Sequence, residues 1–170
     1  MSVEPSLPFQ AILERSLEYV GDTHGPEASN RLFFELYSSI FSHLDREFGP
    51  NAVDAYWRDI ADSHLGDLEN LMLQKGLDGM QEYWSAIGEL EGAAFEMHRR
   101  DDEFELVVKH CPPTAWFTEA NIDPYARYPE HCQALYGRVA DRCGFDMAYT
   151  APIADGSACC RLRFTPRSEQ

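Results

Sequence analysis

The sequence predicts an α+β fold, in which an N-terminal helical half is followed by a small antiparallel sheet with one or two packed helices. Residues 1–90 repeat apolar side chains at helical spacing, whereas residues 94–110 alternate apolar and charged side chains. Helices segregated from paired strands are typical of this class. The 170 residues fit a single domain, 1–170, with residues 1–90 mainly helical and residues 91–165 forming strands plus a helix that carry all the cysteines.

Four helices are expected in the first half, over residues 8–20, 27–48, 51 to about 74, and 77–90. Gly49 and Pro50 end the second helix, and Asn51 is suited to cap the third. Gly66 is expected to kink or divide the third helix, because glycine weakens a helix interior.

Two hairpins and further helical segments are expected in the second half. The strands are residues 94–100, 104–110, 145–153 and 158–165, and the helices are residues 112–117 and 129 to about 143. Asp155-Gly156 is a strong turn signal between the last two strands. Pro129 suits the first position of the longer helix.

Charge and motifs limit the classes of partner. The formal net charge is −15, with 29 acidic and 14 basic residues, which disfavours nucleic acid and anionic membrane surfaces. No signal peptide or membrane-spanning run is recognised, so a cytoplasmic location and no membrane partner are expected. Nucleotide-binding and serine-hydrolase motifs are missing. We therefore expect a small-molecule substrate and no cofactor, and a homo-oligomer remains open.

The cysteines indicate where chemistry would take place. All five, at positions 111, 132, 143, 159 and 160, lie after residue 110. Their odd number and irregular spacing do not match a secreted disulfide framework, which again favours a reducing compartment. A structural zinc site usually shows pairs of cysteines separated by about two to four residues, and no such pair occurs here, so no metal is expected.

Cys111 and Cys132 are the candidate nucleophiles, in that order. Cys111 lies where a strand meets a proline-led turn or helix, a common position for a reactive group. Cys132 would lie in the first turn of a helix, where the positive end of the dipole lowers a thiol pKa. For each of them the alternative is a small buried packing residue. That packing role is favoured for Cys143, and Cys160 is expected to face the core.

His110 and His131 are the candidate bases, because each adjoins a cysteine. Adjacency in sequence does not by itself produce a thiolate–imidazole pair. The pair is therefore expected across space, for example between His131 and Cys111.

The order of these features resembles the L-2-amino-thiazoline-4-carboxylic acid hydrolase family. The resemblance rests on His110-Cys111-Pro112, on Pro129-Glu130-His131-Cys132, and on the stretch from Gly156 to Phe164, in which Cys160, Leu162 and Phe164 alternate with polar residues. It covers about residues 85–165. The family's cysteines correspond to Cys111, Cys132 and Cys160, whereas Cys159 is additional and Leu162 replaces a frequent aromatic residue.

The resemblance implies a cysteine-dependent hydrolase or ring-modifying enzyme that acts on a small, carboxylate-bearing cyclic amidine or a related C=N or C–S substrate. Arg99, Arg161 and Arg163 would be candidates for holding the carboxylate, with surface salt bridges as the alternative. Trp116 and Tyr128 could line the substrate pocket, or pack in the core. Two other classes of protein remain open, namely a small-molecule-binding or sensor domain without turnover, and a zinc-holding regulatory domain.

Overall fold

The α+β prediction is confirmed by the computed structural model, which describes residues 15, 18–19, 21–23, 25–150 and 160–167. The helices are α2 (Pro26–Phe48), α3 (Pro50–His64), α4 (Gly66–Lys75), α5 (Leu77–Glu91), α6 (Pro112–Ala120) and α7 (Glu130–Arg142). The strands are β1 (Ala94–Arg100), β2 (Glu103–His110), β3 (Phe145–Thr150) and β4 (Cys160–Pro166). No helix among the described residues is long and apolar enough to cross a membrane.

The third predicted helix is divided rather than continuous. α3 ends at His64, and α4 begins at Gly66, so that Leu65 lies between them with φ −103° and ψ 24°. The predicted short helix also extends further than expected, because α6 continues to Ala120 and ends where Asn121 adopts a left-handed conformation with φ 53°. The first predicted helix and the turn of the second hairpin lie largely outside the described residues.

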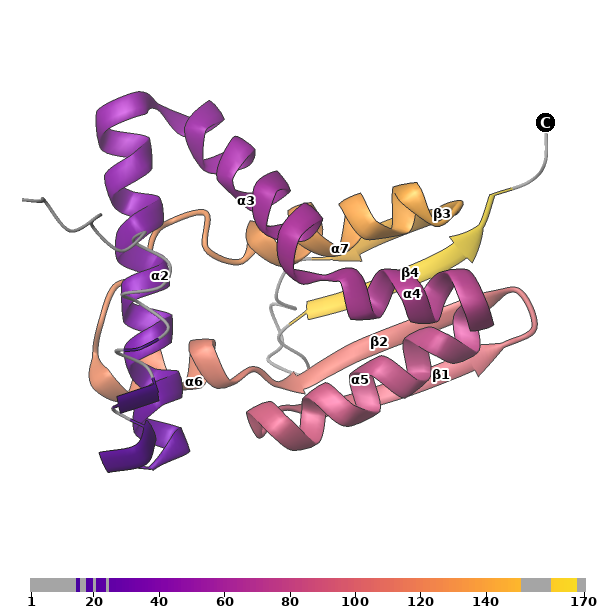
Figure 1. The fold of residues 1–170 in the computed structure, drawn as a ribbon, viewed down its shortest axis with the longest axis horizontal. Helices are drawn as coiled ribbons and strands as arrows, with labels where there is room; N and C mark the ends of the chain where they lie inside the picture. The colour runs from indigo at the N-terminus through magenta and orange to yellow at the C-terminus, as the bar shows by residue number, and fades with distance from the viewer. Residues whose placement is uncertain (1–14, 16–17, 20, 24, 151–159, 168–170) are drawn as a thin grey trace, which may run out of the picture.

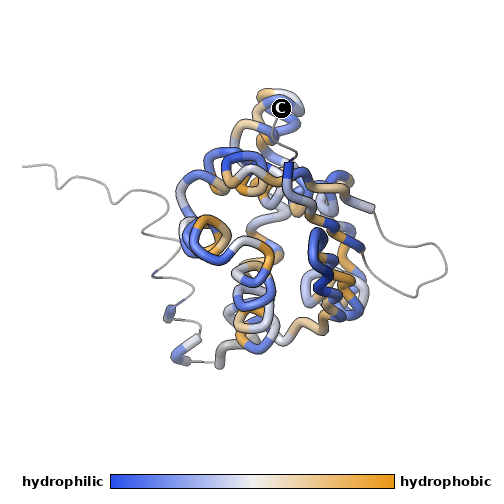
Figure 2. The backbone as a smooth tube through the Cα atoms, turned by 90° about the vertical axis from the view of Figure 1, so that its right-hand side faces the viewer, coloured by the Kyte–Doolittle hydropathy of each residue, from blue (hydrophilic) through white to orange (hydrophobic). Residues whose placement is uncertain are grey.

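The four strands form one antiparallel sheet in the order β1-β2-β4-β3. β2 pairs with β4 in the register Phe104 to Phe164, so the two hairpins join along their inner strands. Helices α4 and α5 cover one face of this sheet, and α2 stands at its end (Figure 1). Viewed from the side, hydrophobic and hydrophilic segments alternate along the same tubes, as expected for elements with one buried face (Figure 2).

The core under the sheet is built around stacked aromatic rings. Trp84 of α5 stacks on Phe104 of β2 with centroids 5.8 Å apart, and lies 5.4 Å from Phe164 of β4. All three side chains are fully buried. Because alternate strand residues point to opposite faces, Arg161 and Arg163 face outward and pair with glutamates of β2.

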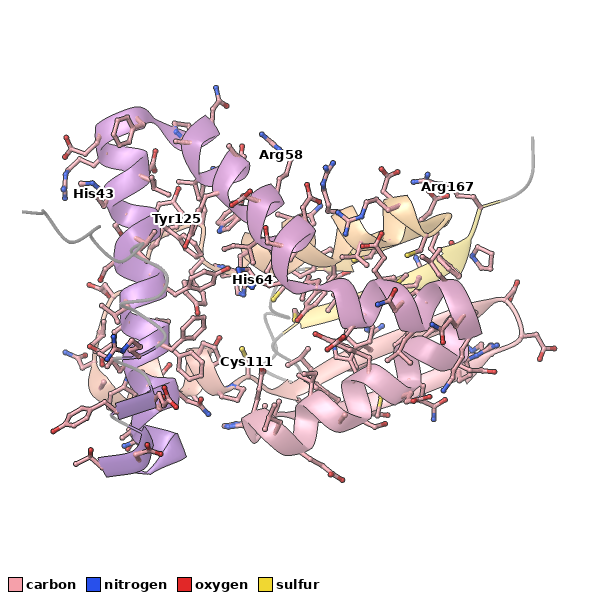
Figure 3. All side chains as sticks on the ribbon, viewed as in Figure 1. His43, Arg58, His64, Cys111, Tyr125 and Arg167 are labelled. Carbon is pink, nitrogen blue, oxygen red and sulfur yellow. The ribbon has the colours of Figure 1, made fainter. Side chains whose placement is uncertain are left out.

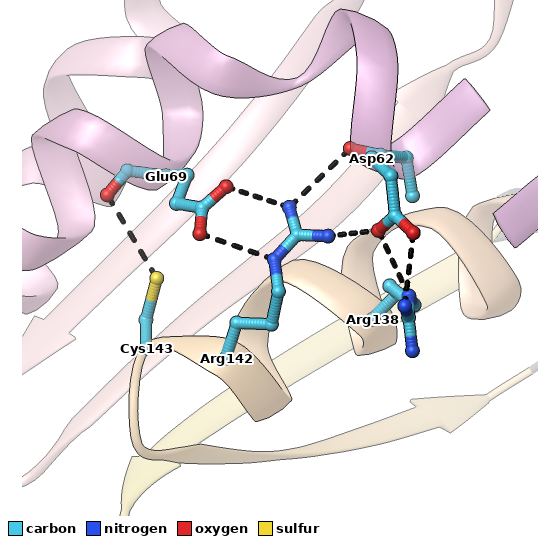
Figure 4. Close-up of polar contacts among 6 residues, drawn as sticks. Asp62, Glu69, Arg138, Arg142 and Cys143 are labelled. Carbon is cyan, nitrogen blue, oxygen red and sulfur yellow. Dashed lines mark hydrogen bonds and ion pairs between the residues drawn. The ribbon is translucent and has the colours of Figure 1, made fainter. Parts of the chain in front are cut away.

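An ion-pair cluster links the helices α3, α4 and α7. Arg142 of α7 donates hydrogen bonds to Glu69 of α4 and to Asp62 of α3, and Arg138 donates two 2.9 Å bonds to the same Asp62 (Figure 4). Beside this cluster, Cys143 points its thiol toward the Glu69 carbonyl, 3.8 Å away, and packs against the core. The structure therefore confirms the prediction that Cys143 is a packing residue.

Candidate active site

A cavity of about 400 Å³ lies where β2 passes into α6 and where the chain enters α7. The walls also include residues from β3 and the first residue of β4. Its described lining residues are Cys111, Thr114, Phe117, Thr118, Asn121, Ile122, Asp123, Pro124, Tyr128, Pro129, His131, Cys132, Tyr149 and Cys160. Five of the residues predicted from the sequence as site residues therefore share one cavity.

Local structure explains why three cysteines meet here. Cys111 has extended backbone angles and is the N-cap of α6, at the strand-to-helix junction labelled in Figure 3. Cys132 lies in the first turn of α7, which begins after Pro129. Cys160 starts β4 on the face that points toward the helices and is 8% exposed. These positions agree with the sequence prediction for all three.

Cys132 forms its histidine contact with its own neighbour. Nε2 of His131 lies 3.6 Å from Sγ of Cys132, within the range of a weak sulfur hydrogen bond. The sequence favoured a pair across space, such as His131 with Cys111, whereas this contact joins neighbours in the chain. The two residues occupy the first turn of α7, where consecutive side chains are separated by about 100° and can both reach one cavity.

The carbonyl of Tyr128 fixes the tautomer of His131. Nδ1 of the ring lies 2.5 Å from this oxygen, which can only accept a hydrogen bond. The proton therefore lies on Nδ1, and Nε2 is left to accept the Cys132 thiol proton. The rings of Tyr128, Tyr37 and Phe41 surround the imidazole, with centroids 4.8, 5.7 and 6.4 Å away.

The ionisation states of this pair differ from the sequence prediction. Burial, and after it the charge of Glu91, raises the pKa of the Cys132 thiol to about 12. Burial lowers the pKa of His131, partly opposed by the Tyr128 carbonyl and by Glu91. Both side chains keep some exposure because they line the cavity, but their ionisable groups are enclosed by protein. The lowered thiol pKa expected at the helix N-terminus is wrong, since desolvation outweighs the helix dipole.

Tyr149 of β3 is placed beside all three cavity cysteines. Its hydroxyl donates a 2.9 Å hydrogen bond to the Pro129 carbonyl at the start of α7. Its pKa is raised first by burial and then by the charges of Cys160, Cys132 and Cys111. Tyr149 thus remains a neutral hydrogen-bonding group in the lining of the same cavity as Cys132. The sequence pointed to no role for this tyrosine.

The three arginines predicted to bind a substrate carboxylate lie elsewhere. Arg99 donates a 2.8 Å hydrogen bond to Asp78 of α5. Arg161 lies 3.6 Å from Glu105, and Arg163 lies 3.8 Å from Glu103, both on the outer face of the sheet. The surface salt-bridge alternative is the one observed. No lysine or arginine is among the described residues that line the cavity.

The remaining predicted residues line a second cavity of about 280 Å³ between α2, α5 and α6. His110 is exposed there, and Trp116 donates a 3.0 Å hydrogen bond to Glu35 of α2. Glu91, the last residue of α5, lines the same cavity. Sequence analysis missed Glu91, because nothing near it in the chain relates it to a histidine 40 positions away.

Comparison with known proteins supplies no assignment for this site. No protein-family model, no curated protein and no solved structure matches the chain. Within the described parts of the chain, no group of three or more histidine, cysteine, aspartate or glutamate side chains has an arrangement suited to hold a metal ion. Functional inference therefore depends on the geometry of the cysteine–histidine pair and its cavity.

Proposed function

We propose that this protein is a cysteine-dependent hydrolase or ring-opening enzyme for a small cyclic amidine or related C=N or C–S compound. The observation that carries the proposal is the contact between Cys132 Sγ and His131 Nε2 at 3.6 Å, in the lining of a cavity of about 400 Å³. A histidine held in one tautomer by a backbone carbonyl is the arrangement that nucleophilic thiols use. This geometry favours Cys132 over Cys111 as the nucleophile.

The reaction would begin from a neutral pair. Sγ of Cys132 attacks the electrophilic carbon while its proton moves to Nε2 of His131. The protonated imidazole then gives this proton to the departing nitrogen or sulfur of the ring. His131 finally removes a proton from water, which attacks the same carbon and releases the Cys132 thiolate to be reprotonated. One water is consumed, and the bond broken is the ring C–N or C–S bond.

The two helix N-termini at the cavity support a substrate that carries an anionic group. Cys111 caps α6, and Cys132 lies in the first turn of α7, so the free N–H groups of both first turns are near the site. Such groups can take over the carboxylate-binding role that the predicted arginines do not fill. Proposed cytoplasmic small-molecule metabolism is consistent with the acidic composition.

The first experiment is covalent trapping. The protein is incubated with 2-aminothiazoline-4-carboxylate and ring analogues, quenched in acid, and read by peptide mass spectrometry together with product analysis. We expect a substrate adduct on Cys132 and a product heavier than the substrate by one water. Cys132→Ser abolishes both, whereas Cys143→Ser, which changes a thiol outside the cavity, leaves both intact. An adduct on Cys111 alone would transfer the nucleophile role to that residue.

The high pKa of Cys132 favours a second candidate, a small-molecule-binding or sensor domain. A neutral, enclosed thiol without an activating cation is a poor nucleophile and reacts slowly. In this case a ring compound would raise the melting temperature in proportion to its occupancy, without adduct or product. Thermal shift and product analysis on the same samples separate the two functions.

A further inference from the structure

Asp123 is the one acidic residue in the described lining of the cysteine cavity, the cavity that Cys111, Cys132 and Cys160 share. All 14 lysines and arginines of the chain are at positions that the structure describes, and none of them lines this cavity. Burial lowers the pKa of His131, which keeps its imidazole neutral near pH 7. The described lining therefore offers a ligand one negative charge and no positive charge.

Contacts on both sides of Asp123 fix the loop that carries it. Just before it, the N–H of Ile122 donates a 2.9 Å hydrogen bond to the Phe117 carbonyl near the end of α6. Two residues after it, the N–H of Tyr125 donates a 2.8 Å hydrogen bond to the buried hydroxyl of Ser38 on α2, beside which Tyr125 lies (Figure 3). The backbone is thus anchored to α6 and α2, so a ligand would need to order only the side chain of Asp123.

The carboxylate of Asp123 forms no salt bridge among the described residues. Arg127, the basic residue nearest to it in the chain, donates 2.8 Å hydrogen bonds to Asp54 and Glu130 instead. These three residues line a separate surface groove between α3 and the start of α7. A cation that binds Asp123 would therefore displace water from the carboxylate and break no existing ion pair.

The buried part of the cavity wall suits a small planar ring. Phe117 and Tyr128 are buried aromatic residues of this wall, and the hydroxyl of Tyr149 is occupied by the Pro129 carbonyl. The volume of about 400 Å³ is at the small end of the range for ligand pockets, so a ligand beside these rings lies within a short distance of the Asp123 carboxylate. Apolar walls strengthen an attraction between charges, because they replace water that would screen it.

We propose that Asp123 binds a cationic group of the substrate, so that the protein takes its cyclic amidine in the protonated, amidinium form. The inference rests on the proposed function, whose substrate it specifies by charge. The two oxygens of a carboxylate can accept parallel N–H hydrogen bonds from an amidinium, as they do from an arginine side chain. A neutral ring of the same shape lacks the charge. Asp123 is thus a specificity-determining residue that selects cationic over neutral ring compounds.

Benzamidine and benzamide test this role without requiring turnover. They share one planar ring, but the first carries a positive amidinium and the second a neutral amide. Dissociation constants are measured by isothermal titration calorimetry near neutral pH, and we expect benzamidine to bind roughly five- to tenfold more tightly. Saturating benzamidine should also slow the alkylation of Cys132 by iodoacetamide, read by peptide mass spectrometry, and should leave Cys143, which lies outside the cavity, unaffected.

Asp123→Asn should bring the ratio of the two dissociation constants close to one by weakening the binding of benzamidine alone. Asp123→Glu, which keeps the charge, should retain a preference for benzamidine. Asp59→Asn is the matched control, because it removes the same charge from an exposed residue of α3 that does not line the cavity. The melting temperature of each variant without ligand shows whether its fold persists. With a ring compound that is turned over, Asp123→Asn should raise KM by a similar factor and leave kcat nearly unchanged.

The outcomes separate this inference from the proposed function. The role of Asp123 is rejected if the native protein binds neither compound or binds both equally, or if Asp123→Asn and Asp59→Asn weaken benzamidine by the same factor. It is also rejected if bound benzamidine leaves the alkylation of Cys132 unchanged, because the cation then lies elsewhere. If the preference depends on Asp123 but no ring compound gives an adduct or a product, Asp123 binds cations, whereas the proposed hydrolase function fails and the cation is not a substrate.

Discussion

His131 and Cys132 are consecutive residues, yet the imidazole Nε2 of one lies 3.6 Å from the thiol of the other, and both residues line one cavity. The Tyr128 carbonyl, three residues earlier, orients the ring from its other side. The proposed nucleophile, its proposed base and the group that orients this base therefore come from five consecutive residues, 128–132, at the entry to α7. This compactness makes the pair sensitive to single substitutions, and it suggests the following predictions.

Replacing His131 by asparagine should slow any turnover by roughly a hundredfold or more, because the thiol proton loses its acceptor. The measurement is the rate of product formation with the ring compound that traps on Cys132. His110→Asn is the matched control, since His110 lies in the second cavity. A loss of activity in the control with normal activity in His131→Asn would identify His110 as the base.

The alkylation of Cys132 by iodoacetamide should rise about tenfold for each pH unit, without a plateau below about pH 10, because only the thiolate reacts and its pKa is about 12. The rate is followed on the Cys132 peptide, with glutathione in parallel as a thiol of ordinary pKa. A plateau near neutral pH would mean that the helix dipole, rather than burial, controls this thiol.

The protein should lose stability on mild acidification partly through His131. Burial lowers its folded pKa, so the unfolded chain binds the proton more readily. This stability is fully present above the unfolded value of about 6.5 and is lost as pH falls from there through the lower folded pKa. Urea unfolding at several pH values should show a steeper loss below this point in the native protein than in His131→Asn. Equal slopes would show that the imidazole is not desolvated.

Gly79→Ala should destabilise the protein by about 3 kcal/mol or more, because a Cβ there would lie 2.1 Å from the Leu71 carbonyl oxygen, where α4 and α5 touch. Gly66→Ala is the matched control. Its Cβ would meet nothing within 4 Å, and alanine favours the helical state, so a gain of up to about 1 kcal/mol is expected. Chemical denaturation measures both, and similar values for the two would contradict the close helix approach.

Helix and strand periods made most of the fold predictable from sequence. The hairpin β1–β2 follows the alternation of Phe104, Leu106 and Val108, and Gly49-Pro50 separates α2 from α3 as expected. The division at Leu65 was only partly foreseen, through Gly66. The pairing of β2 with β4 could not be read from the sequence, because it joins segments that are 54 residues apart at Val107 and Arg161 by contacts that leave no local pattern.

The sequence by itself indicated the local positions of the three thiols that line the cavity. A strand ending in Cys111, a proline-led helix beginning near Cys132, and an alternating strand from Cys160 each fix their thiol's position through local backbone geometry. Only the tertiary structure decided which groups meet. It paired Cys132 with its neighbour His131, and it placed Arg161 and Arg163 on the outer face of the sheet and Arg99 beside Asp78 of α5. Burial and electrostatic fields are sums over the whole fold, and for that reason the direction of the Cys132 pKa shift was opposite to the local expectation.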